Sequence, residues 1–326
     1  MRRLTLLWII AFTMAAWPMR LAAQQPPDRF IGFLSTASPS SSGSEQMVAF
    51  RTGLRDTGYN EGQNIRIEYR WASDDYSRLT TLAAEMVRLR PAVIVAAGGH
   101  VTALVTHDLT KEIPIVFTTV TDPVKDGLVA SLNRPGGNAT GTAGLTSELD
   151  PKRLELLHMM KPSAAIIGVL VNPNRPGLYD QSRELQQAAD SLGVKLAFQN
   201  GATGPEIDSA FEAFASQGVQ ALLVTADPLF NNRRAQILTL AAKYSLPAIY
   251  QWREFASAGG LMSYGPSITA AYRHAGVLAG LILNGAKPAD LPVMQPAKFQ
   301  LVINLNTARQ LGLTPPQDLI PDEAIE

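Results

Sequence analysis

The fold is decided by three short apolar segments that occur twice along the chain. The first set is RFIGFLSTASPS (Arg29–Ser40), AVIVAAGG (Ala92–Gly99) and IPIVFTTV (Ile113–Val120). The second set is AIIGVLVNPNRPG (Ala165–Gly177), ALLVTADP (Ala221–Pro228) and LPAIYQWR (Leu246–Arg253). Each segment ends in small or polar residues, a pattern typical of strands buried on both faces of a parallel sheet. The offset between the sets is about 130 residues, the length of one domain.

Helical segments separate these strands, so the chain is predicted to be α/β, with two similar doubly wound parallel-sheet lobes joined by several connections. The lobes are expected to comprise residues 28–142 plus 263–296 and residues 143–262 plus 297–326. The expected crossovers contain small, permissive residues and lie at Asn138–Gly144, Ala256–Gly265 and Gln295–Ile303. Two lobes joined in this way enclose a cleft that can close over a ligand by hinge motion.

The N-terminus has the composition of an export signal. Arg2-Arg3 precede an apolar run, Leu4–Trp17, and Leu21-Ala22-Ala23 offers a small-residue cleavage site. We therefore predict a signal peptide over residues 1–23, cleaved near Ala23, and a periplasmic location. The alternative is a retained N-terminal anchor, which the shortness of the apolar run disfavours. The absence of cysteine excludes a lipid-modified N-terminal cysteine.

Charge and composition argue against several classes of function. The 28 basic and 28 acidic residues give a formal net charge of zero, which argues against a nucleic-acid partner. With no cysteine, a disulfide, a thiolate metal site and a cysteine nucleophile are all excluded. The four histidines show no metal-binding spacing, and no nucleophile elbow, Walker loop or dinucleotide fingerprint is present. We expect a monomeric binding protein without catalysis, metal or cofactor.

Ligands of open parallel sheets bind beyond the carboxyl ends of the strands. In the first lobe this rule selects loops rich in hydroxyls and exposed amides, which suit a ligand carboxylate. The candidate residues are Ser35, Thr36, Ser38, Ser40, Gly98, Gly99, Thr119, Thr121 and Asp122. The alternative for the serine-rich loop is an ordinary surface turn.

The second lobe is expected to bind the ligand's ammonium and its side group. The candidate residues are Asn172, Thr225, Asp227, Tyr250, Trp252 and Tyr264. Asp227 would accept the ammonium, and the aromatic residues would flank an apolar or planar group. Proline follows both Asp122 and Asp227, as is common at the start of a helix. The alternative for each aspartate is therefore a helix N-cap with no ligand contact. The aromatic residues could equally belong to the core, and the polar Asn172, Asn174 and Arg175 keep a sugar ligand open.

Longer stretches resemble a known family. They are ADPLFNNRR (Ala226–Arg234), LPAIYQWREFASAGGLMSYGP (Leu246–Pro266), GAKPADLPVMQPAKFQLVINLNTARQLGLTPP (Gly285–Pro316), NIRIEYRWA (Asn64–Ala72) and RPGGNATG (Arg134–Gly141). They resemble the ABC-transporter substrate-binding protein family that includes the tryptophan-binding TrpX proteins. The resemblance implies a type I periplasmic-binding-protein fold, with two lobes joined by three crossovers. It also implies capture of a small solute and its delivery to an ABC permease in the inner membrane.

The leading interpretation is therefore an exported solute receptor of an ABC importer. Its ligand is expected to be a small amino acid or related carboxylate with an apolar or aromatic side group. The alternatives are a periplasmic sensing subunit for a membrane receptor, a sugar-binding protein, and a periplasmic hydrolase or isomerase on the same scaffold.

Overall fold

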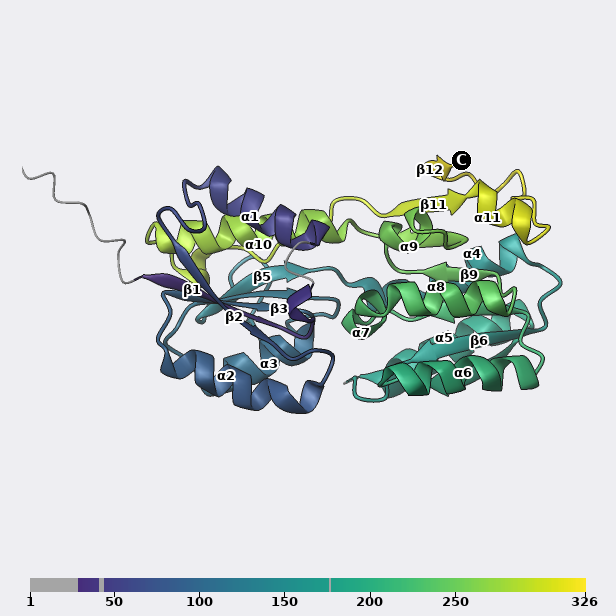
Figure 1. The fold of residues 1–326 in the computed structure, drawn as a ribbon, viewed down its shortest axis with the longest axis horizontal. Helices are drawn as coiled ribbons and strands as arrows, with labels where there is room; N and C mark the ends of the chain where they lie inside the picture. Colours follow the sequence, from purple (N-terminus) through teal and green to yellow (C-terminus); the bar gives the residue numbers. More distant parts are fainter. Residues whose placement is uncertain (1–28, 41–43, 176) are drawn as a thin grey trace, which may run out of the picture.

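The computed structural model describes residues 29–40, 44–175 and 177–326, which form two α/β lobes lying side by side (Figure 1). The predicted signal peptide, residues 1–23, lies outside the described residues. No helix among the described residues has the length and apolar character needed to cross a membrane.

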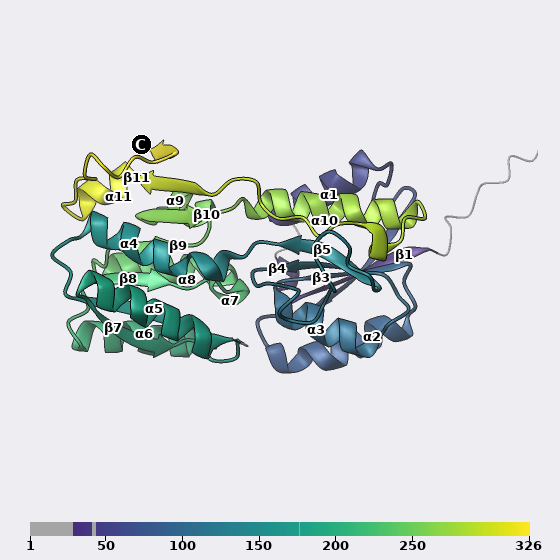
Figure 2. The ribbon, with the colours of Figure 1, turned by 180° about the vertical axis from the view of Figure 1, so that it is seen from behind.

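The first lobe is a five-stranded parallel sheet with the order β2-β1-β3-β4-β5. Its strands are β1 (Phe30–Ser35), β2 (Arg66–Trp71), β3 (Val93–Ala97), β4 (Ile115–Thr119) and β5 (Ala139–Ala143). One face is covered by α1 (Glu45–Asp56) and α10 (Ile268–Leu283), and the other by α2 (Leu79–Arg88) and α3 (His100–Leu109), as Figures 1 and 2 show. Short 3₁₀ turns, η2 (Tyr76–Arg78) and η4 (Pro288–Asp290), complete the lobe.

The helix α10 returns to the first lobe after the chain has built most of the second. It packs against α1 at two glycines, because a Cβ atom on Gly53 would lie 1.8 Å from the Arg273 carbonyl oxygen. A Cβ atom on Gly276 would likewise lie 2.1 Å from the Phe50 carbonyl oxygen. These glycines let the two backbones approach closely and fix α10 to the first lobe.

The second lobe has a seven-stranded sheet with the order β12-β11-β10-β9-β8-β6-β7. Its strands are β6 (Ile166–Val171), β7 (Lys195–Asn200), β8 (Ala221–Val224), β9 (Ala248–Tyr250), β10 (Met262–Gly265), β11 (Gln300–Asn304) and β12 (Glu323–Ile325). All its strand pairs are parallel except the pair β10–β11. The helices are α4 (Asp150–Met160), α5 (Leu178–Leu192), α6 (Gly204–Ser216), α7 (Pro228–Asn232), α8 (Arg234–Lys243), α9 (Arg253–Ser257) and α11 (Leu305–Gln310), preceded by η3 (Thr146–Leu149).

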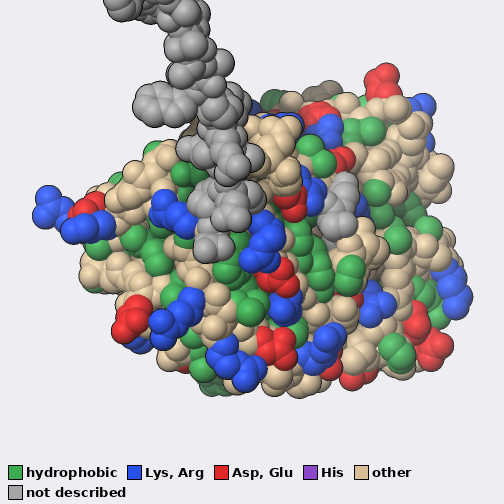
Figure 3. Space-filling model, turned by 60° about the vertical axis from the view of Figure 1, so that its left-hand side comes forward, with side chains coloured by type: hydrophobic (Ala, Val, Ile, Leu, Met, Phe, Trp, Pro, Cys, Tyr) green, Lys and Arg blue, Asp and Glu red, His purple; other side chains and the backbone are tan. Residues whose placement is uncertain are grey.

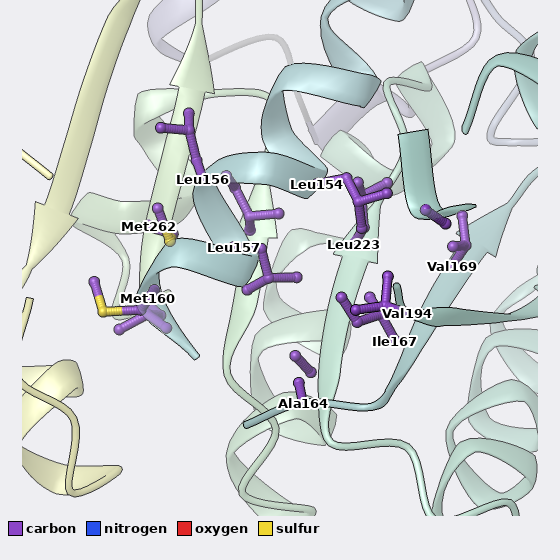
Figure 4. Close-up of a cluster of buried hydrophobic side chains, with 14 of the residues drawn as sticks. Leu154, Leu156, Leu157, Met160, Ala164, Ile167, Val169, Val194, Leu223 and Met262 are labelled. Atoms are coloured by element: carbon purple, nitrogen blue, oxygen red, sulfur yellow. The ribbon is translucent and has the colours of Figure 1, made fainter. Parts of the chain in front are cut away.

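The core of the second lobe lies between α4 and the sheet (Figure 4). Leu154 and Leu157 of α4 pack with Ile167 of β6, Leu223 of β8 and Met262 of β10, and all are buried. The surface is mixed in charge: basic and acidic side chains are interspersed over the face shown in Figure 3.

The chain crosses between the lobes three times, but two of the crossings lie later than predicted. Residues 139–143 form β5 of the first lobe, and residues 262–265 form β10 of the second, so the second crossing follows Gly265. The small residues in these segments are needed for close packing. A Cβ atom on Gly141 would lie 2.1 Å from the Phe117 carbonyl oxygen, and one on Gly265 would lie 2.1 Å from that of Gln251. These segments are rich in small residues, as linkers are, and for that reason the sequence predicted crossovers here.

A buried arginine connects the first two crossings. The Arg153 Nε atom donates to the Tyr264 carbonyl oxygen at 2.7 Å, and its Nη1 atom donates to the Thr146 carbonyl oxygen at 2.9 Å. Its guanidinium also pairs with Asp150, which in turn accepts from Gln181. Burial raises the pKa of Asp150, and the Arg153 charge opposes this shift. The groups beside these two crossings thus form a single buried polar cluster.

Candidate ligand-binding site

A cavity of about 420 Å³ lies between the lobes, beyond the carboxyl ends of the first-lobe strands. Its first wall comes from the loops that follow β1, β3, β4 and β5. Its second wall comes from α7 and from Trp252, which follows β9. The third wall consists of the start of α10 and the last crossing, residues 294–298. The site therefore draws on both lobes and on the segments that join them.

The first-lobe wall depends on two consecutive glycines with positive φ. Gly98 has a φ of 84° and Gly99 a φ of 101°, values that residues other than glycine rarely adopt. The Thr36 Oγ1 atom donates to the Gly98 carbonyl oxygen at 3.2 Å, and a Cβ atom on Gly98 would lie 2.3 Å from Thr36 Oγ1. The loop after β1 and the loop after β3 thus pack in direct contact along the cavity.

Helix α3 begins at this wall. Its N-cap, Gly99, has no side chain to accept from the first-turn amides. Those N–H groups at a helix N-terminus therefore favour a negatively charged group. These amides make this wall suitable for a carboxylate.

The second-lobe wall combines apolar surface with two unpartnered polar atoms. Trp252 is only 5% exposed, and its indole Nε1 atom is buried without a hydrogen-bond partner. The side-chain Oδ1 atom of Asn231 is also buried and unpartnered. Buried polar atoms in native proteins nearly always have a partner, so a ligand is expected to supply one here.

The third wall is mainly apolar. It includes Ile268, Met294 and Pro296, together with Tyr272 of α10. Burial raises the pKa of Tyr272 to about 12, so its ring and hydroxyl are neutral at physiological pH. Lys298 brings a positive charge to the rim, where its exposed ammonium pairs with Asp322 at 2.9 Å.

Beside the cavity, a buried hydrogen bond joins the two lobes. The Tyr76 hydroxyl of the first lobe donates to Asp227 Oδ1 of the second at 3.0 Å. The same oxygen accepts from Asn172 Nδ2 at 3.2 Å and from the Leu229 amide at 2.9 Å. Burial raises the pKa of Asp227, although these donors oppose the shift. Asp227 therefore caps α7 and holds the first lobe at the same time.

A second interlobe contact lies nearby. Asp74 accepts from Asn232 Nδ2 at 2.7 Å and lies 3.1 Å from Arg233 Nε. Its loop is fixed to the first-lobe wall, because the Asp74 amide donates to the Thr36 carbonyl oxygen at 2.8 Å and the Ser73 amide donates to that of Ala37 at 2.9 Å. The loop that lines the cavity is thus directly bonded to the loop that contacts the other lobe. The structure shows the lobes in contact across the cleft.

Six of the residues selected from the sequence line the cavity: Ser35, Thr36, Gly98, Gly99, Thr119 and Trp252. The other first-lobe candidates have local partners. Ser38 and Ser40 share a hydrogen bond of 2.6 Å at the surface, and Thr121 bonds Thr119 at 2.8 Å. Asp122 Oδ1 accepts from the Val124 amide at 2.9 Å, so this aspartate caps the turn that follows it, which was the alternative to a ligand contact.

The other second-lobe candidates do not line the cavity. Thr225 donates to the Leu170 carbonyl oxygen at 2.8 Å, and Asn172 donates to Asp227. Tyr250 is buried with its ring stacked on Phe255 at 4.5 Å, and Tyr264 lies beside Phe299 at 6.3 Å.

Asn231, Tyr272 and Met294 also line the cavity and were not predicted from the sequence. Tyr272 lies on the long helix α10 and Met294 in the last crossing, so neither follows the end of a predicted strand. A signal for Asn231 was present in the Asp-Pro-Leu-Phe-Asn-Asn run, since a short helix after a strand end places its last residues at the same edge of the sheet.

Two α/β lobes, three connections and a cavity between the lobes define the type I periplasmic-binding-protein fold. Residues 40–324 match the family model described as ABC transporter substrate binding protein. The chain is 30% identical over 264 residues to the Tyrosine-binding protein of Clostridioides difficile, covering 81% of this chain and 75% of that relative. The chain therefore belongs to the ABC transporter substrate-binding protein family.

Two solved structures at 25% identity have the same fold, and each comparison covers 91% of this chain and 99% of the other. One is a conserved domain protein from Vibrio cholerae, with a TM-score of 0.80. The other is an ABC domain from Streptococcus pneumonia in complex with L-Trp, with a TM-score of 0.78.

Proposed function

We propose that this protein is the exported receptor of an ABC importer for an aromatic amino acid or a closely related aromatic carboxylate. The single observation that carries the proposal is the cavity between the lobes, with the N-terminus of α3 on one side and Trp252 on the other. Relatives described as tyrosine-binding and as a complex with L-Trp support the same class of solute.

The two ends of the ligand follow from the chemistry of the walls. The carboxylate would lie at the first-lobe wall, against the α3 amides after Gly99. The ring would lie against Trp252 and Met294, where burial of apolar surface favours binding. A cavity of about 420 Å³ falls in the range of small-molecule sites.

Transport requires export and a membrane partner. We infer that residues 1–23 are removed and that the mature monomer works in the periplasm, without a nucleic-acid partner, delivering its ligand to an inner-membrane ABC permease. Mass spectrometry of the exported protein should find an N-terminus near Gln24. An intact Met1 in the membrane fraction would overturn the export part of the proposal.

Isothermal calorimetry with the purified protein tests the ligand class. Aromatic amino acids, aromatic carboxylates, branched-chain amino acids and sugars form the panel. We expect binding by at least one aromatic carboxylate-bearing compound, and a ligand at one hundred times its Kd should raise the free energy of unfolding by about 2.7 kcal/mol. The Trp252→Ala variant should weaken this binding by about 2 kcal/mol or more, because it removes the aromatic wall.

The Trp252→Phe variant is the control, since it keeps an aromatic surface and should retain most of the affinity.

Binding of a sugar with no heat from any aromatic carboxylate would contradict the proposal. Conversion of the bound compound into a product would support the hydrolase alternative instead. Uptake of the ligand that is unchanged when the gene for this protein is deleted would favour sensing over transport.

A further inference from the structure

The cavity wall lacks a counter-ion for an ammonium group. Among the lining residues that the structure describes, none is an aspartate or a glutamate. The ionisable lining groups apart from Tyr272 are Lys298 and His274, which carry positive charge when they are protonated. A zwitterionic amino acid would find partners for its carboxylate here but no opposite charge for its ammonium.

The nearby carboxylates are already committed. Asp227 Oδ1 accepts three hydrogen bonds, from Tyr76, Asn172 and the Leu229 amide, and Asp227 does not line the cavity. Asp74 pairs with Asn232 and Arg233. Neither carboxylate lines the cavity, so an ammonium inside it would not be in direct contact with Asp227 or Asp74.

The unpartnered groups at the second-lobe wall are neutral. Asn231 offers a buried amide oxygen, which accepts a hydrogen bond, and Trp252 offers a buried indole N–H, which donates one. Burying a charge without an opposite charge costs far more than burying a neutral polar group that gains a hydrogen bond. The wall is therefore complementary to a neutral polar group on a flat ligand.

We propose that the ligand is recognised as an aromatic monocarboxylic acid and that an α-ammonium group contributes nothing to its affinity. The carboxylate binds at the first-lobe wall, and Asn231 accepts from a hydroxyl or ring N–H of the ligand. Asn231 is the specificity-determining residue. Its neutral amide offers no charge to an ammonium group, whereas an aspartate at the same position would supply the missing counter-ion. This inference rests on the proposed function, since it assigns a substrate class to the same cavity.

Calorimetry on matched ligand pairs tests the inference with the wild-type protein. The pairs are tyrosine with hydroxyphenylpropanoate and tryptophan with indolepropanoate, which differ only by the amino group. The corresponding amines, tyramine and tryptamine, lack the carboxylate. We expect the des-amino acids to bind at least as tightly as the amino acids, and the amines to give no measurable heat.

The Asn231→Asp variant sharpens the test. It should shift the affinity ratio of amino acid to des-amino acid by at least about tenfold toward the amino acid, because it places a carboxylate in the wall. Asn174→Asp, at an exposed position of the second lobe, adds the same charge outside the cavity and should leave the ratio unchanged.

The outcomes separate the two proposals. A wild-type preference of about tenfold or more for the amino acids would overturn this inference while leaving the proposed function intact. An unchanged ratio in a folded Asn231→Asp variant would also overturn it. Binding by neither member of either pair would count against the proposed function itself. If the variant fails to fold, the wild-type pairs decide the question alone.

Discussion

Replacing Arg153 with methionine is expected to lower the free energy of unfolding by about 3–5 kcal/mol, the usual effect of removing one partner of a buried ion pair. The change leaves Asp150 buried without its cation and frees two carbonyl oxygens, those of Thr146 and Tyr264. Both carbonyls belong to segments next to crossings between the lobes. Urea denaturation followed by circular dichroism measures the loss.

The matched control is Lys152→Met, at the neighbouring position of the same helix. Lys152 is half exposed and pairs with Glu155 at 2.8 Å on the surface. Surface ion pairs contribute about 0–1 kcal/mol, so this variant should stay close to the wild type. Equal, small losses in both variants would show that the Arg153 cluster does not hold the crossings together.

Replacing Gly99 with alanine is expected to weaken ligand binding by about 1–3 kcal/mol, which is roughly 5- to 150-fold in Kd. A Cβ atom at this position would lie 2.7 Å from Cγ of the Pro228 ring, which belongs to the opposite lobe. The clash exists only when the lobes are in contact. The variant should therefore remain folded and should favour an open form that binds ligand poorly.

Gly259→Ala provides the comparison for backbone strain. Gly259 has a φ of 104°, close to that of Gly99, but a Cβ atom there would meet nothing within 4 Å. Both variants should lose some stability, since a side chain is unfavourable at such φ values. Calorimetry should find weakened ligand binding only in Gly99→Ala. Unchanged affinity in that variant would mean that the contact between Gly99 and Pro228 does not form when ligand binds.

The strands that could be predicted are those whose apolar runs are buried on both faces. The segments around Ile94, Val116, Val169 and Leu223 became β3, β4, β6 and β8, which are interior strands of the two sheets. The strands β5 and β10 were assigned to crossovers because their glycines resemble linker residues. Gly141 and Gly265 occur there because the neighbouring backbone is too close for a side chain, a fact that depends on contacts distant in sequence.

The candidate site was predictable where it depends on strand ends and not where it depends on side-chain direction. The strand-end rule located Thr36, Gly98 and Gly99, which the structure places in the cavity wall. The Asp-Pro pattern at Asp227 gave no way to distinguish a helix cap from a ligand contact. Its hydrogen bond to Tyr76 joins residues 151 positions apart, and only the folded chain reveals it.

A crystal structure of the protein with its tightest aromatic carboxylate would test the central claim most directly. We predict that the ligand lies between the lobes, with its carboxylate within about 3.2 Å of the first-turn amides of α3. Its ring should contact Trp252, and the bond between Tyr76 and Asp227 should remain in place. A ligand bound outside this cavity, or one whose carboxylate faces the second lobe, would contradict it.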